Sequence, residues 1–265
     1  MSLLPLQGRR VLVTRAAHQA GKLSDGLLAL GAEPVEVPAI EIRPPESFAA
    51  IDVALANLPG YDWLILTSAN TVRAMADRAA HMGIFLGQSE SLKVAAIGEA
   101  TAKAARTAGL HVTFVPESYV AESLVHGLAA QSTGKKILLL RAAIARDVIP
   151  DALRQSGAHV DVVDAYRNVM PESAPPLLRQ ALSRGVDAAT FTSSSSVLHL
   201  SYAARAAGVA WPFDGVAAVS IGPITSRTLR ESGWEPAAEA DPSDVEGLIA
   251  ALARIWGSGI PEKAG

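Results

Sequence analysis

The 265-residue chain contains no cysteine. It therefore has no disulfide bond, no thiolate nucleophile and no cysteine-ligated metal, which fits a reducing cytoplasm. The six histidines show no HxxxH or HxH spacing, so the sequence predicts no metal site. No GxGxxG, complete P-loop or GxSxG motif occurs. A dinucleotide site, a nucleotide-phosphate loop and a serine nucleophile elbow therefore have no support.

Long apolar runs and a strong net charge are also missing. No stretch reaches the ~18 apolar residues expected of a membrane helix, and residues 1–10 lack the apolar core of a signal peptide. The net charge is −3, whereas proteins that bind nucleic acid usually carry a basic face. These absences predict a cytoplasmic protein that binds neither a membrane nor nucleic acid.

The sequence does contain a long-period repeat. Three pairs of segments match: residues 11–17 with 137–143, residues 67–72 with 192–197, and residues 97–101 with 221–225. The offsets are 126, 125 and 124 residues, far longer than the ~20–50 residues of a solenoid repeat. With 49% hydrophobic residues the chain can bury two cores. The repeat therefore predicts two similar lobes with a cleft between them.

Short β-branched or leucine-rich runs alternate with segments of helical apolar spacing along the whole chain. Strands are predicted at residues 11–14, 32–37, 63–66, 94–97, 112–115, 137–140, 160–163, 188–191, 217–221 and 236–239. Glycines at positions 31, 109, 157, 208 and 233 stand where the helices should end. This alternation predicts an α/β fold with doubly wound parallel sheets, covered by helices on both faces.

Two extended segments, residues 38–45 and 164–171, follow the second strand of each repeat copy. They can lie side by side as the only crossings between the lobes. The first strand–helix–strand then joins the C-terminal part of the chain to form one lobe. A simple division near Gly134, within the loop-like residues 131–135, fits the spacing equally well. The spacing alone does not separate the two arrangements.

Polar residues gather where the predicted strands are followed by helices. Ligands of doubly wound sheets bind outside the carboxyl ends of the strands, and the first turn of a helix there offers free N–H groups to an anion. The candidate substrate-binding residues at these ends are Thr14, Arg15, Thr67, Ser68, Asn70, Gly98, Thr101, Arg141, Thr192, Ser193, Ser194, Gly222, Pro223 and Thr225. Helix capping alone explains any single Thr-Ser pair, since Ser, Thr and Asn are favoured N-caps. The four consecutive serines at 193–196 exceed one cap, which favours a ligand surface for the whole set.

Three side chains have two interpretations each. Arg15 and Arg141 occupy equivalent positions of the repeat, where they can pair with the carboxylates of a ligand or with neighbouring acids. Tyr166, one of four tyrosines, lies on a predicted crossing between the lobes. Its phenol can face the cleft, but the packing of an amphipathic side chain on a linker explains it at least as well from the sequence alone.

Several short motifs, in this order and spacing, resemble the uroporphyrinogen-III synthase family. They are the first strand with its Arg15-Ala16-Ala17, residues 63–72 (WLILTSANTV), residues 96–102 (AIGEATA), residues 163–167 (VDAYR) and residues 220–225 (SIGPIT). The resemblance runs from Arg10 to Leu252. It implies the discontinuous arrangement, with one lobe of residues 1–38 and 167–265 and a second lobe of residues 39–166. Two extended linkers then join the lobes on either side of a cleft.

The resemblance also implies a reaction. A lyase of this family closes the linear tetrapyrrole hydroxymethylbilane, with loss of water and inversion of ring D, to give uroporphyrinogen III without a cofactor or metal. The family's cleft positions fall on Thr67, Ser68, Thr101, Tyr166, Ser193 and Thr225, and Tyr166 is the catalytic candidate that assists departure of the hydroxyl. Many members have a threonine two residues after this tyrosine, where this chain has Asn168. A monomer is expected, and a transient contact with hydroxymethylbilane synthase stays open.

Two other classes compete with this interpretation. A two-lobe protein that only binds an anion or a tetrapyrrole would keep the same fold and lose the chemistry. A nucleotide-sugar transferase would need acidic ribose ligands and a catalytic base in the cleft, and the sequence shows neither.

Overall fold

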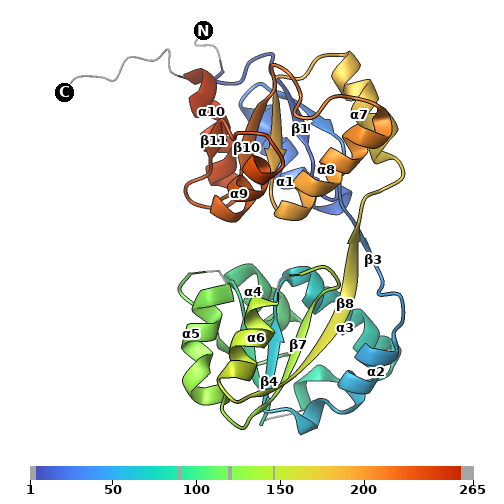
Figure 1. Cartoon of the computed structure of the whole chain (residues 1–265), viewed down its shortest axis with the longest axis vertical. Helices are drawn as coiled ribbons and strands as arrows, with labels where there is room; N and C mark the ends of the chain where they lie inside the picture. The colour runs from blue at the N-terminus through green and yellow to red at the C-terminus, as the bar shows by residue number, and fades with distance from the viewer. Residues whose placement is uncertain (1–3, 89–90, 119–120, 146, 258–265) are drawn as a thin grey trace, which may run out of the picture. The chain divides into compact units, whose positions relative to one another are not determined.

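The computed structural model describes residues 4–88, 91–118, 121–145 and 147–257 (Figure 1). The chain divides into two compact units, the first made of Met1–Glu41 with Val169–Gly265 and the second of Ile42–Asn168. It passes from one unit to the other twice, between Glu41 and Ile42 and again between Asn168 and Val169. Each unit is an α/β domain, as the alternation of apolar runs predicts.

The first unit contains a five-stranded sheet in the order β2-β1-β9-β10-β11. The strands are β1 (Arg10–Val13), β2 (Glu33–Glu36), β9 (Ala188–Phe191), β10 (Ala217–Ser220) and β11 (Ala238–Glu239), and all their pairings are parallel. The central strand β9 is buried at all four positions. A continuous apolar run, rather than an alternating one, is expected of a parallel strand covered on both faces.

Five helices cover this sheet: α1 (Ala17–Ala29), α7 (Ala174–Ser183), α8 (Ser194–Ala207), α9 (Pro223–Glu231) and α10 (Val245–Gly257). Leu178 of α7 and Leu200 of α8 belong to one apolar cluster, on one face of the sheet. Leu23 of α1 and Leu248 of α10 belong to another, on the opposite face (Figure 1). The two clusters are the two halves of the core of this unit.

The second unit contains a six-stranded sheet in the order β3-β8-β7-β4-β5-β6. Its strands are β3 (Glu41–Arg43), β4 (Trp63–Leu66), β5 (Lys93–Ala96), β6 (Val112–Phe114), β7 (Lys136–Ala142) and β8 (His159–Val169). The short helical turns η1 (Leu58–Gly60) and η2 (Leu86–Gln88) lie in its connections. The two extended segments found in the sequence pair with each other here, as neighbouring strands β3 and β8.

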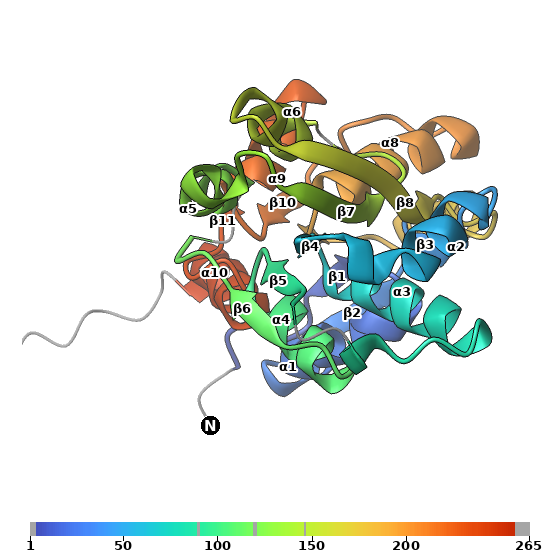
Figure 2. The same cartoon turned by 90° about the horizontal axis from the view of Figure 1, so that it is seen from below.

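The helices of the second unit are α2 (Ala49–Ala56), α3 (Ala69–His81), α4 (Glu99–Thr107), α5 (Ala121–Ser132) and α6 (Val148–Gln155). Helices α2, α3 and α4 pack on one face through residues such as Leu55 and Met75. Helices α5 and α6 pack on the other through Leu124 and Leu153 (Figure 2).

The two sheets have one topology, traced from different starting points. Counting β1, β2, β9, β10 and β11 as strands one to five, the order in the first unit is 2-1-3-4-5. The same order appears in the second unit when β7, β8, β4, β5 and β6 are counted one to five. The sequence repeat is therefore a structural repeat. The strand order that both sheets share is the one known from flavodoxin-like folds.

The glycines predicted to end helices all have positive φ: Gly31, Gly109, Gly157, Gly208 and Gly233 lie between 67° and 89°. At the end of α8, Gly208 is the left-handed C-cap itself, with φ 67° and ψ 32°. A Cβ atom is disfavoured in this region, so glycine is the residue that ends such a helix most readily.

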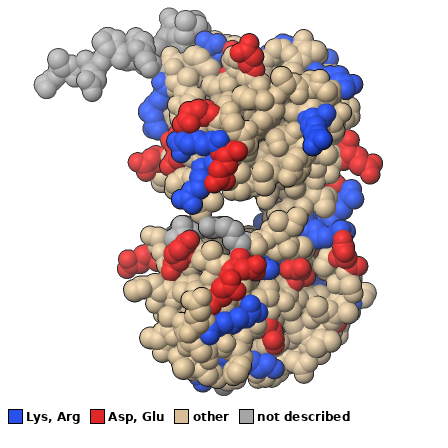
Figure 3. Space-filling model, in the orientation of Figure 1, with Lys and Arg blue, Asp and Glu red and all other residues tan. Residues whose placement is uncertain are grey.

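Among the described helices, none combines the length and the apolar character needed to cross a membrane. On the face seen in Figure 3, the basic and acidic side chains of the described residues are interspersed. Ion pairs among the described residues include Arg230 with Glu235 at 2.9 Å.

Candidate active site

The topology indicates where each sheet would receive a ligand. In a 2-1-3-4-5 sheet the strand order reverses between strands one and three, and ligands bind at the carboxyl ends beside that point. In the first unit these strands are β1 and β9, followed by Thr14-Arg15 and by Thr192-Ser193. In the second unit they are β7 and β4, of which β7 carries Arg141 near its end and β4 is followed by Thr67-Ser68.

In the second unit the structure brings four hydroxyl groups into one hydrogen-bonded chain. Tyr166 Oη lies 3.2 Å from Ser68 Oγ, and Ser68 Oγ lies 2.9 Å from Thr71 Oγ1. Thr67 Oγ1 lies 3.3 Å from the same Thr71 hydroxyl and donates to the carbonyl of Leu140 at 3.4 Å. The structure thus brings together the predicted residues Thr67, Ser68 and Tyr166. Ser68 and Tyr166 are 98 residues apart in the sequence.

Ser68 serves two purposes in this chain. It is the N-cap of α3, with extended backbone, and its Oγ accepts a hydrogen bond from the Thr71 amide at 3.1 Å. Capping therefore fixes the Ser68 hydroxyl at the end of β4. The sequence analysis missed Thr71, which is fully buried. Its position three residues after a serine cap is the signal by which it can be found.

A β-bulge places Tyr166 at this site. Arg141 of β7 pairs with Asp164 of β8, but the next β7 residue, Ala142, pairs with Tyr166, so Ala165 is the extra residue. An extra residue reverses the alternation of side chains beyond it. As a result Ala165 and Tyr166 both join the apolar cluster under α2, α3 and α4, and Tyr166 is 6% exposed.

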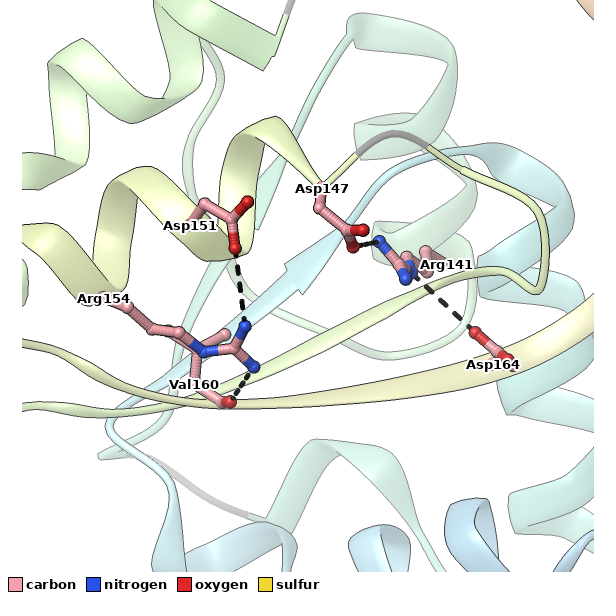
Figure 4. A network of polar contacts seen from close by, with 6 residues as sticks. All are labelled: Arg141, Asp147, Asp151, Arg154, Val160 and Asp164. Carbon is pink, nitrogen blue, oxygen red and sulfur yellow. Dashed lines mark hydrogen bonds and ion pairs between the residues drawn. The ribbon is translucent and has the colours of Figure 1, made fainter.

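Arg141 is held by acids of its own unit (Figure 4). Its Nη1 lies 2.7 Å from Asp147, just before α6, and its Nε lies 3.8 Å from Asp164, its neighbour on β8. A second pair, Arg154 with Asp151 at 3.7 Å, lies beside it on α6. The sequence analysis did not single out Asp147 or Asp164, because their proximity to Arg141 depends on strand register.

The equivalent edge of the first unit is also rich in hydroxyls. Ser193 is the N-cap of α8 and forms a capping box with Ser196, whose amide donates to Ser193 Oγ at 3.2 Å. Ser194 Oγ lies 2.7 Å from Thr228 Oγ1 of α9. Thr192 and Ser193 remain half-buried. Helix capping and a contact between two helices therefore account for part of the serine run.

Thr14 and Arg15 differ although they are adjacent. Thr14 is fully buried, and its Oγ1 donates to the carbonyl of Thr190 at 2.7 Å. Arg15 is half-buried, and its Nε is buried without a hydrogen-bond partner among the described residues. Burial lowers the pKa of the Arg15 guanidinium. The Thr14 hydroxyl is thus hydrogen-bonded within the sheet, whereas Arg15 Nε makes no such bond among the described residues.

The remaining candidates lie at the first turns of three helices. Gly98 and Gly222 are the N-caps of α4 and α9, and Pro223 is at the start of α9. Thr101 and Thr225, each three residues after its N-cap glycine, are 6% and 4% exposed. Asn70 accepts a hydrogen bond from Arg73 Nη1 at 2.9 Å on α3. No group of three or more His, Asp or Glu side chains that could hold a metal ion occurs among the described residues.

Comparison with known proteins identifies the family. The family model described as uroporphyrinogen-III synthase HemD matches residues 7–250. A uroporphyrinogen-III synthase of Synechococcus elongatus is 35% identical, over 95% of this chain and 97% of the relative. A putative uroporphyrinogen-III synthase of Methanothermobacter thermautotrophicus is 32% identical, over 94% of this chain and 99% of the relative.

Solved structures agree at the level of the fold. A mutant uroporphyrinogen III synthase of Thermus thermophilus matches with a TM-score of 0.67 at 20% identity, over 95% of this chain and all of that one. The corresponding synthetase of Helicobacter pylori matches with a TM-score of 0.60 at 16% identity, over 94% of this chain and all of that one. With a family model that spans nearly its whole length and relatives above 30% identity, the chain belongs to the uroporphyrinogen-III synthase family, enzymes of porphyrin biosynthesis.

Proposed function

We propose that this protein is a cofactor-independent lyase that converts hydroxymethylbilane to uroporphyrinogen III and water. Membership of the family supports the reaction. The observation that carries the proposal in this chain is the hydroxyl chain from Tyr166 through Ser68 and Thr71 to Thr67, at the carboxyl edge of the second sheet.

The first chemical step is loss of the bilane's terminal hydroxyl. The carbon–oxygen bond breaks as the pyrrole nitrogen supplies electrons, which leaves an azafulvenium cation that keeps its N–H proton. The departing oxygen needs one proton to leave as water, and we assign its delivery to Tyr166 Oη. The proton released when the macrocycle closes returns the tyrosine to its starting state. A phenol suffices because the pyrrole nitrogen supplies most of the driving force.

Ser68 and Thr71 are positioning residues in this proposal. The Ser68 hydroxyl is fixed by the Thr71 amide at 3.1 Å and in turn fixes Tyr166 Oη at 3.2 Å. The tyrosine is therefore oriented before substrate arrives. Orientation is the larger part of the catalytic task, since correct ring closure demands that ring D react through its substituted carbon. Placement of reacting groups can supply ~7–11 kcal/mol.

The eight carboxylates of the bilane require anion contacts. We propose that helix N-termini provide them, at Ser68 of α3, Gly98 of α4, Ser193 of α8 and Gly222 of α9. Thr67, Asn70, Thr101, Thr192, Ser194, Pro223 and Thr225 accompany these termini in the proposal. Thr14 is left out, because its hydroxyl is buried and bonded to Thr190.

Cofactor independence can be tested directly. The protein is dialysed against EDTA, desalted and supplied with hydroxymethylbilane made in situ from porphobilinogen. Unchanged formation of the type III isomer is the expected result. Activity that returns only on addition of a metal salt or a cell extract filtrate would contradict a cofactor-independent reaction, while leaving the family assignment intact.

A further inference from the structure

The two arginines related by the repeat have opposite electrostatic surroundings. Arg15 follows β1 and Arg141 lies on β7, strands that occupy the same place in the two sheets. The residues are 126 positions apart, which is the offset of that part of the repeat. Equivalent positions would ordinarily suggest equivalent roles, but the neighbouring acids differ.

Arg141 has its charge compensated within its own unit. Asp147 lies 2.7 Å from Nη1 and Asp164 lies 3.8 Å from Nε, and the Arg141 side chain is 14% exposed. Any ligand carboxylate would have to displace these acids. Displacement costs much of what the new ion pair would contribute, so Arg141 is a poor anion receptor.

The first unit lacks both compensating acids. With the same offset of 126 residues, the counterpart of Asp164 is Pro38 and the counterpart of Asp147 is Gly21. The printed strand register ends at Val13 and Glu36. Beyond it the Ala39 amide donates to the Thr14 carbonyl, so Pro38 lies beside Thr14, next to Arg15 in the sequence. Proline has no side-chain charge and no free N–H to offer.

Arg15 is accordingly an uncompensated cation. Among the described residues no carboxylate forms an ion pair with Arg15, whereas Arg141 has two. A half-buried charge of this kind is costly for the folded protein unless a partner of opposite charge arrives. It lies at the point of strand-order reversal, where ligands bind in such sheets.

We propose that Arg15 is the residue that pairs with a carboxylate of the tetrapyrrole's side chains, and that Arg141 does not share this role. The inference rests on the proposed function for the nature of the ligand. The asymmetry between the two arginines makes Arg15 a specificity-determining residue for an anionic side chain. A guanidinium can hold such a carboxylate through two parallel hydrogen bonds.

The test uses Arg15→Gln and uroporphyrin III, a stable polycarboxylate related to the product, as the probe. Loss of a charge-assisted pair should weaken binding by about 10- to 100-fold, raise the KM for bilane and change kcat much less. Arg230→Gln is the matched control, since it removes an exposed arginine of the same unit that is paired with Glu235. The control should bind uroporphyrin III as the wild type does.

Two further measurements separate binding from a structural role. Arg15→Gln should leave the melting temperature unchanged or raise it, since the substitution removes an uncompensated charge. Pro38→Asp keeps Arg15 and introduces an acid at the position that corresponds to Asp164 in the sequence repeat, and it should also weaken probe binding. Wild-type affinity in both variants would overturn the inference. A second outcome would also overturn it. In this outcome Arg15→Gln lowers both the melting temperature and the affinity for the probe, while Pro38→Asp binds the probe as the wild type does.

The outcomes distinguish this inference from the proposed function. Wild-type protein that forms the type III isomer, with an Arg15→Gln variant of unchanged KM and probe affinity, sinks the role of Arg15 and leaves the enzyme standing. Wild-type protein that forms no type III isomer, with an Arg15→Gln variant that loses probe binding, sinks the enzyme and leaves the anion site.

Discussion

Replacing Tyr166 with phenylalanine removes one oxygen atom and keeps the buried ring. The side chain is 6% exposed and packs in the apolar cluster under α2, α3 and α4, so the aromatic contacts survive the change. The lost hydrogen bond is the one to Ser68 Oγ at 3.2 Å. Ser68 keeps the Thr71 amide and hydroxyl at 3.1 and 2.9 Å. The stability cost should therefore lie at the low end of the ~0.5–1.5 kcal/mol typical of one hydrogen bond.

The effect on catalysis should be larger than the effect on folding but still modest. The pyrrole nitrogen drives hydroxide departure, and the phenol only eases it. We expect Tyr166→Phe to lower kcat about fivefold, which corresponds to ~1 kcal/mol of transition-state stabilisation. Turnover should persist, because the positioning of the bilane does not depend on the lost oxygen.

The assay measures kcat at saturating hydroxymethylbilane, with the type III isomer quantified by chromatography after oxidation. Tyr61→Phe is the matched control, since Tyr61 is also buried in the second unit and donates a hydrogen bond to Asp161 at 2.8 Å. Tyr61 precedes β4, at the end of the strand opposite to Thr67 and Ser68. Its kcat should equal that of the wild type. A wild-type kcat in Tyr166→Phe would remove this residue from the mechanism, and a thousandfold fall would refute the minor role given to the phenol.

Three further predictions concern stability. Burial and the Asp161 carboxylate raise the pKa of Tyr61 to about 12, so the folded state holds a proton that the unfolded state releases near pH 10. The stability of the folded protein should therefore fall between pH 10 and 12, as measured by melting curves at several pH values. A melting temperature of Tyr61→Phe that falls as steeply with pH as that of the wild type would contradict this. Trp234 is 5% exposed and in edge contact with Phe191, Trp211 and Phe213. Trp234→Ala should therefore lower the free energy of unfolding by ~3–5 kcal/mol, measured by urea unfolding. A decrease under ~1 kcal/mol would show that the aromatic cluster does not hold this unit together. Thr14→Val should cost ~1 kcal/mol and leave the KM for bilane unchanged, since the hydroxyl bonds to Thr190; a raised KM in steady-state kinetics would return Thr14 to the substrate contacts.

Much of the fold was predictable because parallel strands buried on both faces read as short continuous apolar runs. The predicted bounds of β4 and β9 match the structure at both ends. The largest difference is in β8: the predicted apolar run ended at residue 163, whereas the strand runs to Val169. The added part belongs to the predicted extended segment 164–171 and lies beside β3 in the sheet. Its place in the repeat indicated this neighbour, whereas its apolar spacing did not mark it as part of the strand.

The candidate site was predictable where it depends on strand ends and unpredictable where it depends on register. Thr67 and Ser68 follow β4 directly, so their place at the carboxyl edge follows from the strand assignment. Tyr166 faces Ser68 only because the bulge at Ala165 changes the alternation, and no sequence pattern announces that bulge. The contrast between Arg15 and Arg141 likewise depends on which acids the fold brings beside each arginine.

The isomer ratio of the cyclised product tests the central claim most directly. Porphobilinogen and its deaminase supply hydroxymethylbilane with and without a catalytic amount of this protein, and isomers I and III are separated after oxidation. The account predicts that type I dominates without the protein and that the type III fraction rises with protein concentration until it dominates. Type I product at the uncatalysed rate, in the presence of protein shown to be folded, would contradict it.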